Sequence, residues 1–180
     1  MSEIDLAASG IIIRPATVAD IATMVDFRVR MFREMGWSDE TTFDTFAPRA
    51  AEHLREGFAA GTCNGFIAEE TAEDGARSVV GTVSLVWQRV APSVRNLDGR
   101  QVYVLGMFVA PERRRRGIAR ALISACVACA TEGGAPLISL HASDEGRPLY
   151  EQLGFIASSE MRRFTEHAGP AAWTPAYDAD

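Results

Sequence analysis

The hydrophobic positions at the start of the chain predict a strand followed by a helix. The apolar run Ile11–Ile13 ends at Pro15, which is typical of a short strand. From Asp20 the apolar residues recur at helical spacing, and this period stops before Gly36. The residues that carry the period are Ile21, Met24, Val25, Phe27, Arg28 and Met31.

A second helix and a hairpin are expected next. Residues 41–58 have a weaker helical pattern, and Pro48 is expected to interrupt it because proline removes a backbone donor. Residues 66–68 and 79–87 are strand-like, and residues 73–75, reading Glu-Asp-Gly, give a turn signal between them. The two strands are therefore predicted to pair as a hairpin.

The segment at residues 102–109 is apolar on both alternating faces. Val104 and Phe108 are expected on one face, with Met107 and Val109 on the other. A strand of this kind is typical of the centre of a sheet that is covered on both sides.

The remaining pattern predicts a second group of elements. These are a helix from Ile118 that ends at Gly133, a strand at 137–140, a short helix at 145–153 and a final strand or strand pair from Phe155. The full order of elements is mixed, and it predicts an α/β or α+β sandwich with a partly parallel end.

Length and composition are those of one folded domain. The chain has 180 residues, of which 47% are hydrophobic and 23% charged. We expect the domain to span residues 11–166, with an N-terminal extension at 1–10 and a C-terminal tail at 167–180. Its oligomeric state is open, and a homodimer is one possibility.

The net charge of -6 argues against a nucleic-acid or anionic-membrane partner, because a polyanion would be repelled on average. The first residues lack the basic start and apolar stretch of a signal peptide, and no apolar run is long enough to span a bilayer. We therefore expect a cytoplasmic location.

The chain has three cysteines, an odd number that argues against a disulfide framework. Cys126 and Cys129 form a C-x-x-C, a pattern that also occurs in redox sites and as half of a zinc site. Because they lie in an alanine-rich helical pattern without a second ligand pair, we expect them to be buried small side chains. No metal is expected.

An anion site is predicted where the apolar strand at 102–109 leads into a helix. Pro111, four arginines at 113–116 and Gly117 lie at this junction. A helix N-terminus has unpaired N–H groups and the positive end of the helix dipole, and glycine lets a phosphate approach the backbone. The alternative is a solvated basic turn or a nucleic-acid contact.

The segment V-A-P-E-R-R-R-R-G-I-A, residues 109–119, resembles the cofactor-binding motif of the GCN5-related N-acetyltransferase superfamily. The superfamily's core pattern, Gln or Arg, two residues, Gly, one residue, then Gly or Ala, is matched from Arg114 to Ala119. A second block, L-Y-E-Q-L-G-F at residues 149–155, is similar to the superfamily's late helix and strand entry. The resemblance implies a mixed, mostly antiparallel central sheet with splayed parallel strands and flanking helices.

The resemblance also implies acetyl-CoA as the acetyl donor and direct attack by an amine, without a covalent acetyl-enzyme. In the superfamily a bulged central strand supplies a backbone N–H to the thioester carbonyl. The implied cofactor-binding residues are Met107, Phe108, Val109, Arg114, Arg115, Arg116, Gly117, Ile118, Ala119 and Ser143. Ser143 is a departure, because many members have an asparagine there.

Tyr150 matches the superfamily's tyrosine general acid, which protonates the leaving thiolate. The alternative is a packed helix residue. The general base is not evident: Glu34 and His141 are candidates, and a water chain is a third.

The acceptor is expected to bind beside the first helix. Candidate residues are Phe32, Glu34, Trp37 and Trp87, although the aromatic rings would equally serve to close the core. Residues 34–74 are rich in acids, so a small cationic amine is favoured. The alternatives are a protein N-terminal or lysine acetyltransferase and a non-catalytic acyl-CoA-binding sensor.

Overall fold

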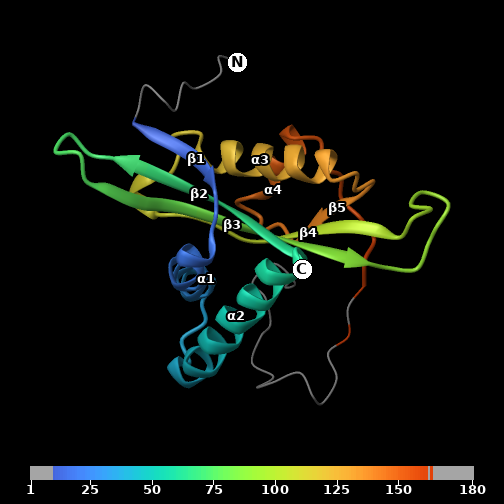
Figure 1. Cartoon of the computed structure of the whole chain (residues 1–180), viewed down its shortest axis with the longest axis horizontal. Helices are drawn as coiled ribbons and strands as arrows, with labels where there is room; N and C mark the ends of the chain where they lie inside the picture. The colour runs from blue at the N-terminus through green and yellow to red at the C-terminus, as the bar shows by residue number, and fades with distance from the viewer. Residues whose placement is uncertain (1–9, 162, 164–180) are drawn as a thin grey trace. The chain divides into compact units, whose positions relative to one another are not determined.

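The computed structural model describes residues 10–161 and 163, which fall into two compact units divided after His141. The first unit contains a five-stranded sheet in the order β1-β2-β3-β4-β5 (Figure 1). Neighbouring strands are antiparallel except β4 and β5, which are parallel. The strands are β1 (Ile11–Pro15), β2 (Cys63–Thr71), β3 (Arg77–Arg89), β4 (Arg100–Val109) and β5 (Ile138–Leu140). The predicted mixed sheet with a parallel end is confirmed.

Helices cover both faces of this sheet (Figure 1). The helix α3 (Ile118–Glu132) lies on one face, where Leu122 contacts Gly81 of β3. The helices α1 (Ile21–Glu34) and α2 (Glu40–Ala60) lie on the other face. Two 3-10 turns, η2 (Val18–Asp20) and η3 (Pro111–Arg113), precede α1 and α3.

An ion-pair network fixes the start of α1 to the edge of the sheet. The Arg14 guanidinium donates to both Asp20 carboxylate oxygens, at 2.8 and 2.9 Å, and to Glu69 of β2 at 2.9 Å. The Asp20 carboxylate also accepts the Thr17 amide at 2.8 Å. These donors, the Arg14 guanidinium foremost, hold the pKa of the buried Asp20 carboxyl well below its usual value.

The prediction that Pro48 interrupts the second helix is wrong, because α2 continues through it. A proline leaves the carbonyl four residues earlier without its helical partner. Both Pro48 and Asp44 are exposed, so water can satisfy that carbonyl. The start of α2 is capped by Asp39, whose carboxylate accepts the Thr41 amide at 3.0 Å.

The hairpin of β2 and β3 is present as predicted. The pairing of β3 with β4 is irregular at one point. Two residues separate Leu105 from Phe108 in β4, whereas only one separates their partners in β3. The extra residue is a β-bulge, and Gly106 has the φ of 62° that glycine adopts readily in such bulges.

The prediction that Val104 and Phe108 share one face of β4 is wrong, because the bulge lies between them. An extra residue reverses the alternation of the side chains that follow it, so Phe108 no longer shares a face with Val104. The Phe108 ring packs edge-on against Phe27 of α1, with 6.0 Å between ring centroids. Val109 instead lies beside Gly81, on the face that α3 covers.

The second unit contains the helix α4 (Arg147–Gln152), within the predicted residues 145–153. The prediction of a strand from Phe155 is wrong for residues 155–161, which have no regular structure. Ile156 and Met161 are exposed there, so the segment lacks the buried apolar alternation of a strand. The proposed tail at 167–180 lies outside the described residues.

The three cysteines are free thiols. Cys126 and Cys129 both belong to α3, and burial raises the pKa of each thiol. The prediction that both are buried small side chains is confirmed for Cys126, whereas Cys129 is only half-buried. None of the helices in the described part of the chain is long and apolar enough to cross a membrane.

Asp20→Asn tests the network at the start of α1. At pH 7 it should lower the free energy of unfolding by about 1–3 kcal/mol, because the Arg14 guanidinium loses one of its two charged partners and keeps only Glu69. The folded-state pKa of Asp20 lies below its unfolded value of about 3.9, so this contribution is complete above that pH and is lost as the pH falls below it. Urea titrations between pH 7 and 3 should therefore show the wild type and variant converging.

The matched control is Asp26→Asn, an exposed carboxylate on the same helix. It should change the free energy of unfolding by less than about 0.5 kcal/mol. A constant difference between wild type and Asp20→Asn down to pH 3 would contradict the role given to the Asp20 charge.

Candidate functional site

The edge of β4 that faces β5 is paired only at its start (Figure 1). The last parallel pair is Val104 with Leu140, and the Gly106 bulge follows two residues later. From Leu105 to Val109 this edge has no strand partner among the described residues. Alternate backbone amides of a strand point to each edge, so this stretch can bind an extended polar chain.

The loop after β4 presents backbone N–H groups at the start of α3. Its first part is fixed by the Ala110 amide, which donates to the Val80 carbonyl at 2.9 Å. Arg115 and Gly117 have left-handed backbones, with φ of 62° and 81°. Ala121 makes the first helical bond, to the Gly117 carbonyl at 3.0 Å, so the amides of residues 118–120 have no helical acceptor. Such a turn at a helix N-terminus is suited to an anion.

Two of the four loop arginines are held by one carboxylate of β2. Arg113 donates to Glu70 at 2.6 Å, and Arg116 donates to the other Glu70 oxygen at 2.7 Å. The Arg113 and Arg116 guanidinium groups lower the pKa of the Glu70 carboxyl. The pair of bridges ties both ends of the arginine run to the sheet.

Arg114 ties the middle of the loop to α1. Its guanidinium pairs with Glu34, donates to the Val109 carbonyl at 3.1 Å and lies 5.3 Å from the Phe108 ring centroid. Arg115 is the one loop arginine for which no hydrogen bond or ion pair is found among the described residues. Among the described residues, the arginine run is therefore divided between three side chains that hold the loop and one, Arg115, without a partner.

The structure brings together three of the four predicted acceptor residues near the end of α1. Phe32 packs edge-on against Trp37, with 6.3 Å between ring centroids, and Glu34 lies on the same helix. Trp87 is elsewhere: it pairs with Val102 at the start of β4, and its ring covers Gly133 at the end of α3. The length of β4 separates Trp87 from the loop.

The other predicted residues are placed as follows. His141 is exposed, and its ring lies 5.5 Å from the Tyr103 ring. In the second unit, Tyr150 is buried in α4 with its ring edge-on to Phe155 at 5.8 Å. The Ser143 hydroxyl oxygen accepts the Gly146 amide at 3.2 Å at the start of α4.

Sequence reasoning missed Glu70 as the anchor of the loop. Its signal was weak, because an acid near the end of a strand is common and its two partners lie 43 and 46 residues away.

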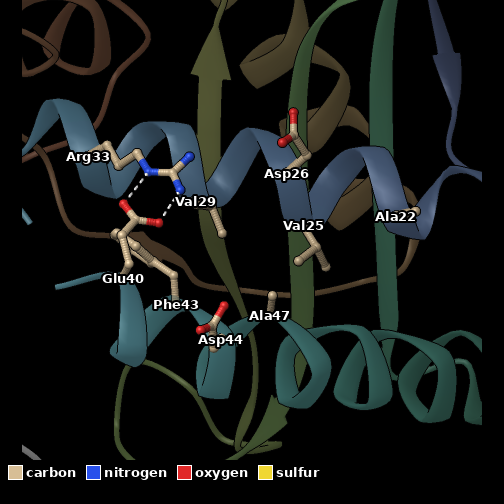
Figure 2. Close-up of a pocket in the computed structure, with 9 residues that line it drawn as sticks. All are labelled: Ala22, Val25, Asp26, Val29, Arg33, Glu40, Phe43, Asp44 and Ala47. Atoms are coloured by element: carbon tan, nitrogen blue, oxygen red, sulfur yellow. Dashed lines mark hydrogen bonds and ion pairs between the residues drawn. The ribbon is translucent and has the colours of Figure 1, made fainter. Parts of the chain in front are cut away.

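A separate hollow of about 410 Å³ lies between α1 and α2 (Figure 2). An ion pair from Arg33 of α1 to Glu40 of α2, at 2.6 Å, lies at one end of it (Figure 2). None of the predicted site residues lines it. We assign the hollow to the packing of the two helices, with Val29 and Phe43 buried at its base.

The geometry can be compared with known proteins. The profile of the acetyltransferase (GNAT) family matches residues 28–155. A GCN5-related N-acetyltransferase from Ralstonia eutropha JMP134 is 28% identical, with a TM-score of 0.76 over 87% of this chain and 99% of that one. A predicted acetyltransferase from Clostridium acetobutylicum, whose structure contains acetyl-CoA, is 25% identical, with a TM-score of 0.75 over 86% and 96%.

An uncharacterized N-acetyltransferase of Streptomyces griseus is 28% identical over 145 residues, which are 78% of this chain and 26% of that protein. The chain spans about a quarter of the length of the curated relatives it matches.

Substitutions at Arg115 test the strain in the loop. Arg115→Gly should be more stable than Arg115→Ala by about 1 kcal/mol, because only glycine adopts the φ of 62° without strain. Thermal or urea unfolding of the two variants measures the difference.

Arg95 provides the control, because it is exposed and does not have a positive φ. There the order should reverse, with the glycine variant no more stable than the alanine variant. The same order at both positions would contradict a strained Arg115.

Proposed function

The chain belongs to the acetyltransferase (GNAT) family, and we propose that it transfers the acetyl group of acetyl-CoA to the amine of a small molecule. The observation that carries the proposal is the continuous segment 105–119. It joins an unpaired strand edge, a bulge and an anion-binding turn in one stretch of chain. The acetyl-CoA in the Clostridium structure supports the same donor here.

The residues of this segment fit the two halves of the donor. Backbone amides of Gly117, Ile118 and Ala119, with the free Arg115 cation, suit the negative pyrophosphate. Arg114 and Arg116 act through their carboxylate partners, by keeping those amides in place. The unpaired edge at Met107, Phe108 and Val109 suits the amide groups of the pantetheine arm.

Acetyl-CoA supplies an activated acyl group as a thioester. The bulge turns the backbone of β4 out of regular pairing, which frees an N–H to polarise the thioester carbonyl. The amine nitrogen forms the new C–N bond as the C–S bond breaks. We propose that the Tyr150 phenol gives its proton to the departing sulfur, as the L-Y-E-Q-L-G-F block implies.

The attacking amine must also lose a proton, and we propose that water removes it. Glu34 is engaged by Arg114, which disfavours it as a base. His141 lies in an exposed position against Tyr103. Ser143 is proposed to reach the donor only through water, because its hydroxyl oxygen already accepts the Gly146 amide.

The acids that favoured a cationic acceptor are partly engaged in the structure. Glu34 pairs with Arg114, Glu40 pairs with Arg33, and Asp39 caps α2. The remaining charge near the end of α1 therefore gives little attraction for a polycation. We retain a small-molecule amine as the proposed acceptor, in the cytoplasm, with a homodimer as the proposed assembly.

Calorimetric titration with acetyl-CoA tests the donor. The wild type should bind, and Arg115→Ala should bind about 5- to 30-fold more weakly, because one charged hydrogen bond contributes about 1–2 kcal/mol. Arg95→Ala should bind as the wild type does. Absence of binding at millimolar acetyl-CoA would overturn the proposal, and binding without thiol release for any amine would favour the sensor.

Tyr150→Phe tests the general acid. The variant should lose at least tenfold in kcat with little change in acetyl-CoA affinity, because proton donation acts on the leaving group and not on ground-state binding. Thiol release with a chromogenic reagent and calorimetry give the two values. Unchanged kcat would remove Tyr150 from this role.

A further inference from the structure

Within the described residues, Arg28 is a charged side chain without a charged partner. It lies on α1, and its Nε atom is sealed from solvent with no hydrogen-bond partner. Neither an ion pair nor a hydrogen bond to its guanidinium is found within the part of the chain that the structure describes. The Phe46 and Phe32 rings lie 5.1 and 5.7 Å from it.

Such an arrangement is unfavourable in the ligand-free protein. Burial lowers the pKa of Arg28, and no acid opposes that effect. Aromatic faces attract a cation but replace only part of its hydration. The two nearby acids of α1 give no compensation, since Glu34 pairs with Arg114 and Asp26 is exposed. A partly buried guanidinium whose Nε has no partner is suited to bind an anion through its other nitrogens.

Arg28 lies beside the β4 bulge, so an anion bound to it would lie close to the proposed site of acyl transfer. Its Cδ atom lies 3.6 Å from the place where a Cβ of Gly106 would stand. Gly106 is the bulge residue, just beyond the last β4–β5 pair. Under the proposed function, the thioester carbonyl binds at this bulge, so a group held by Arg28 belongs to the acceptor.

We propose that Arg28 binds a carboxylate of the acceptor, which is then an amine that also carries a carboxylate, such as an amino acid or a short peptide. This assignment rests on the proposed function and specifies its substrate class. A single guanidinium beside two apolar rings matches the charge and planar geometry of one carboxylate. A phosphate monoester carries close to two charges and would need further donors.

Arg28 is a specificity-determining residue in this assignment. It binds the acceptor in the ground state and takes no part in proton transfer. The acceptor nitrogen attacks as described above, and the carboxylate leaves unchanged in the N-acetyl product. The charge expected of the acceptor near α1 therefore changes: beside its amine, the acceptor carries an anionic group.

The experiment compares matched acceptors by thiol release. Methionine, leucine and phenylalanine are each tested beside their carboxamides and their decarboxylated amines, together with glucosamine 6-phosphate and spermidine. The wild type should use at least one free acid with a kcat/KM at least about 30-fold above that of its carboxamide, because the amide leaves Arg28 unpaired.

Variants at Arg28 separate recognition from folding. Arg28→Met should reduce kcat/KM for the free acid at least about 30-fold, bring acid and carboxamide to similar values and leave acetyl-CoA affinity unchanged. Its thermal midpoint should equal or exceed that of the wild type, since a buried unpaired charge is removed. Arg28→Lys should keep part of the preference, and Arg49→Met, at an exposed arginine of α2, should keep all of it.

The other possible results would each contradict either the carboxylate assignment or the proposed enzyme activity. Equal use of acids and carboxamides by the wild type would overturn the carboxylate assignment and leave the acetyltransferase in place. Preference for glucosamine 6-phosphate or for spermidine over every free acid would also overturn it. Absence of thiol release with the whole panel, despite acetyl-CoA binding, would overturn the proposed enzyme on which the assignment rests.

Discussion

The extra residue of β4 at Gly106 is the constraint on which the rest of the site depends. It reverses the side-chain alternation, so Phe108 faces α1 and contacts both Phe27 and the Arg114 guanidinium. It also lies where β4 loses β5 as a partner, which leaves one edge of a central strand open. A regular strand would direct Phe108 towards α3 and would give the loop no aromatic support.

Charge pairing then gives the loop its shape. Glu70 of β2 and Glu34 of α1 together hold three side chains of the arginine run. Like-charged neighbours would otherwise repel one another, and the left-handed backbone at Arg115 is unfavourable for a residue with a side chain. The carboxylates thus offset the cost of concentrating positive charge at a helix N-terminus, and they leave Arg115 and the backbone amides for a ligand.

Local patterns gave correct predictions wherever a segment's own residues decide its structure. The start of α1 follows from Asp20 and the apolar period, and the hairpin follows from its turn residues. The predictions were wrong where exposure to solvent, and not the local pattern, decides the backbone structure. Pro48 lies within α2 at an exposed position, where solvent can satisfy the freed carbonyl, and residues 155–161 form no strand because Ile156 and Met161 are exposed.

The sequence by itself determined the order of elements, the strand-loop-helix junction at 109–119 and the resemblance that names the family. These depend on neighbours in the chain. Tertiary structure decided which arginines are paired, because Glu34 and Arg114 are 80 residues apart. It also decided that Arg28, one member of the helical period of α1, lies beside the Gly106 bulge with no hydrogen-bond or ion-pair partner among the described residues. No spacing rule encodes such contacts, since they form only when the sheet and helices pack.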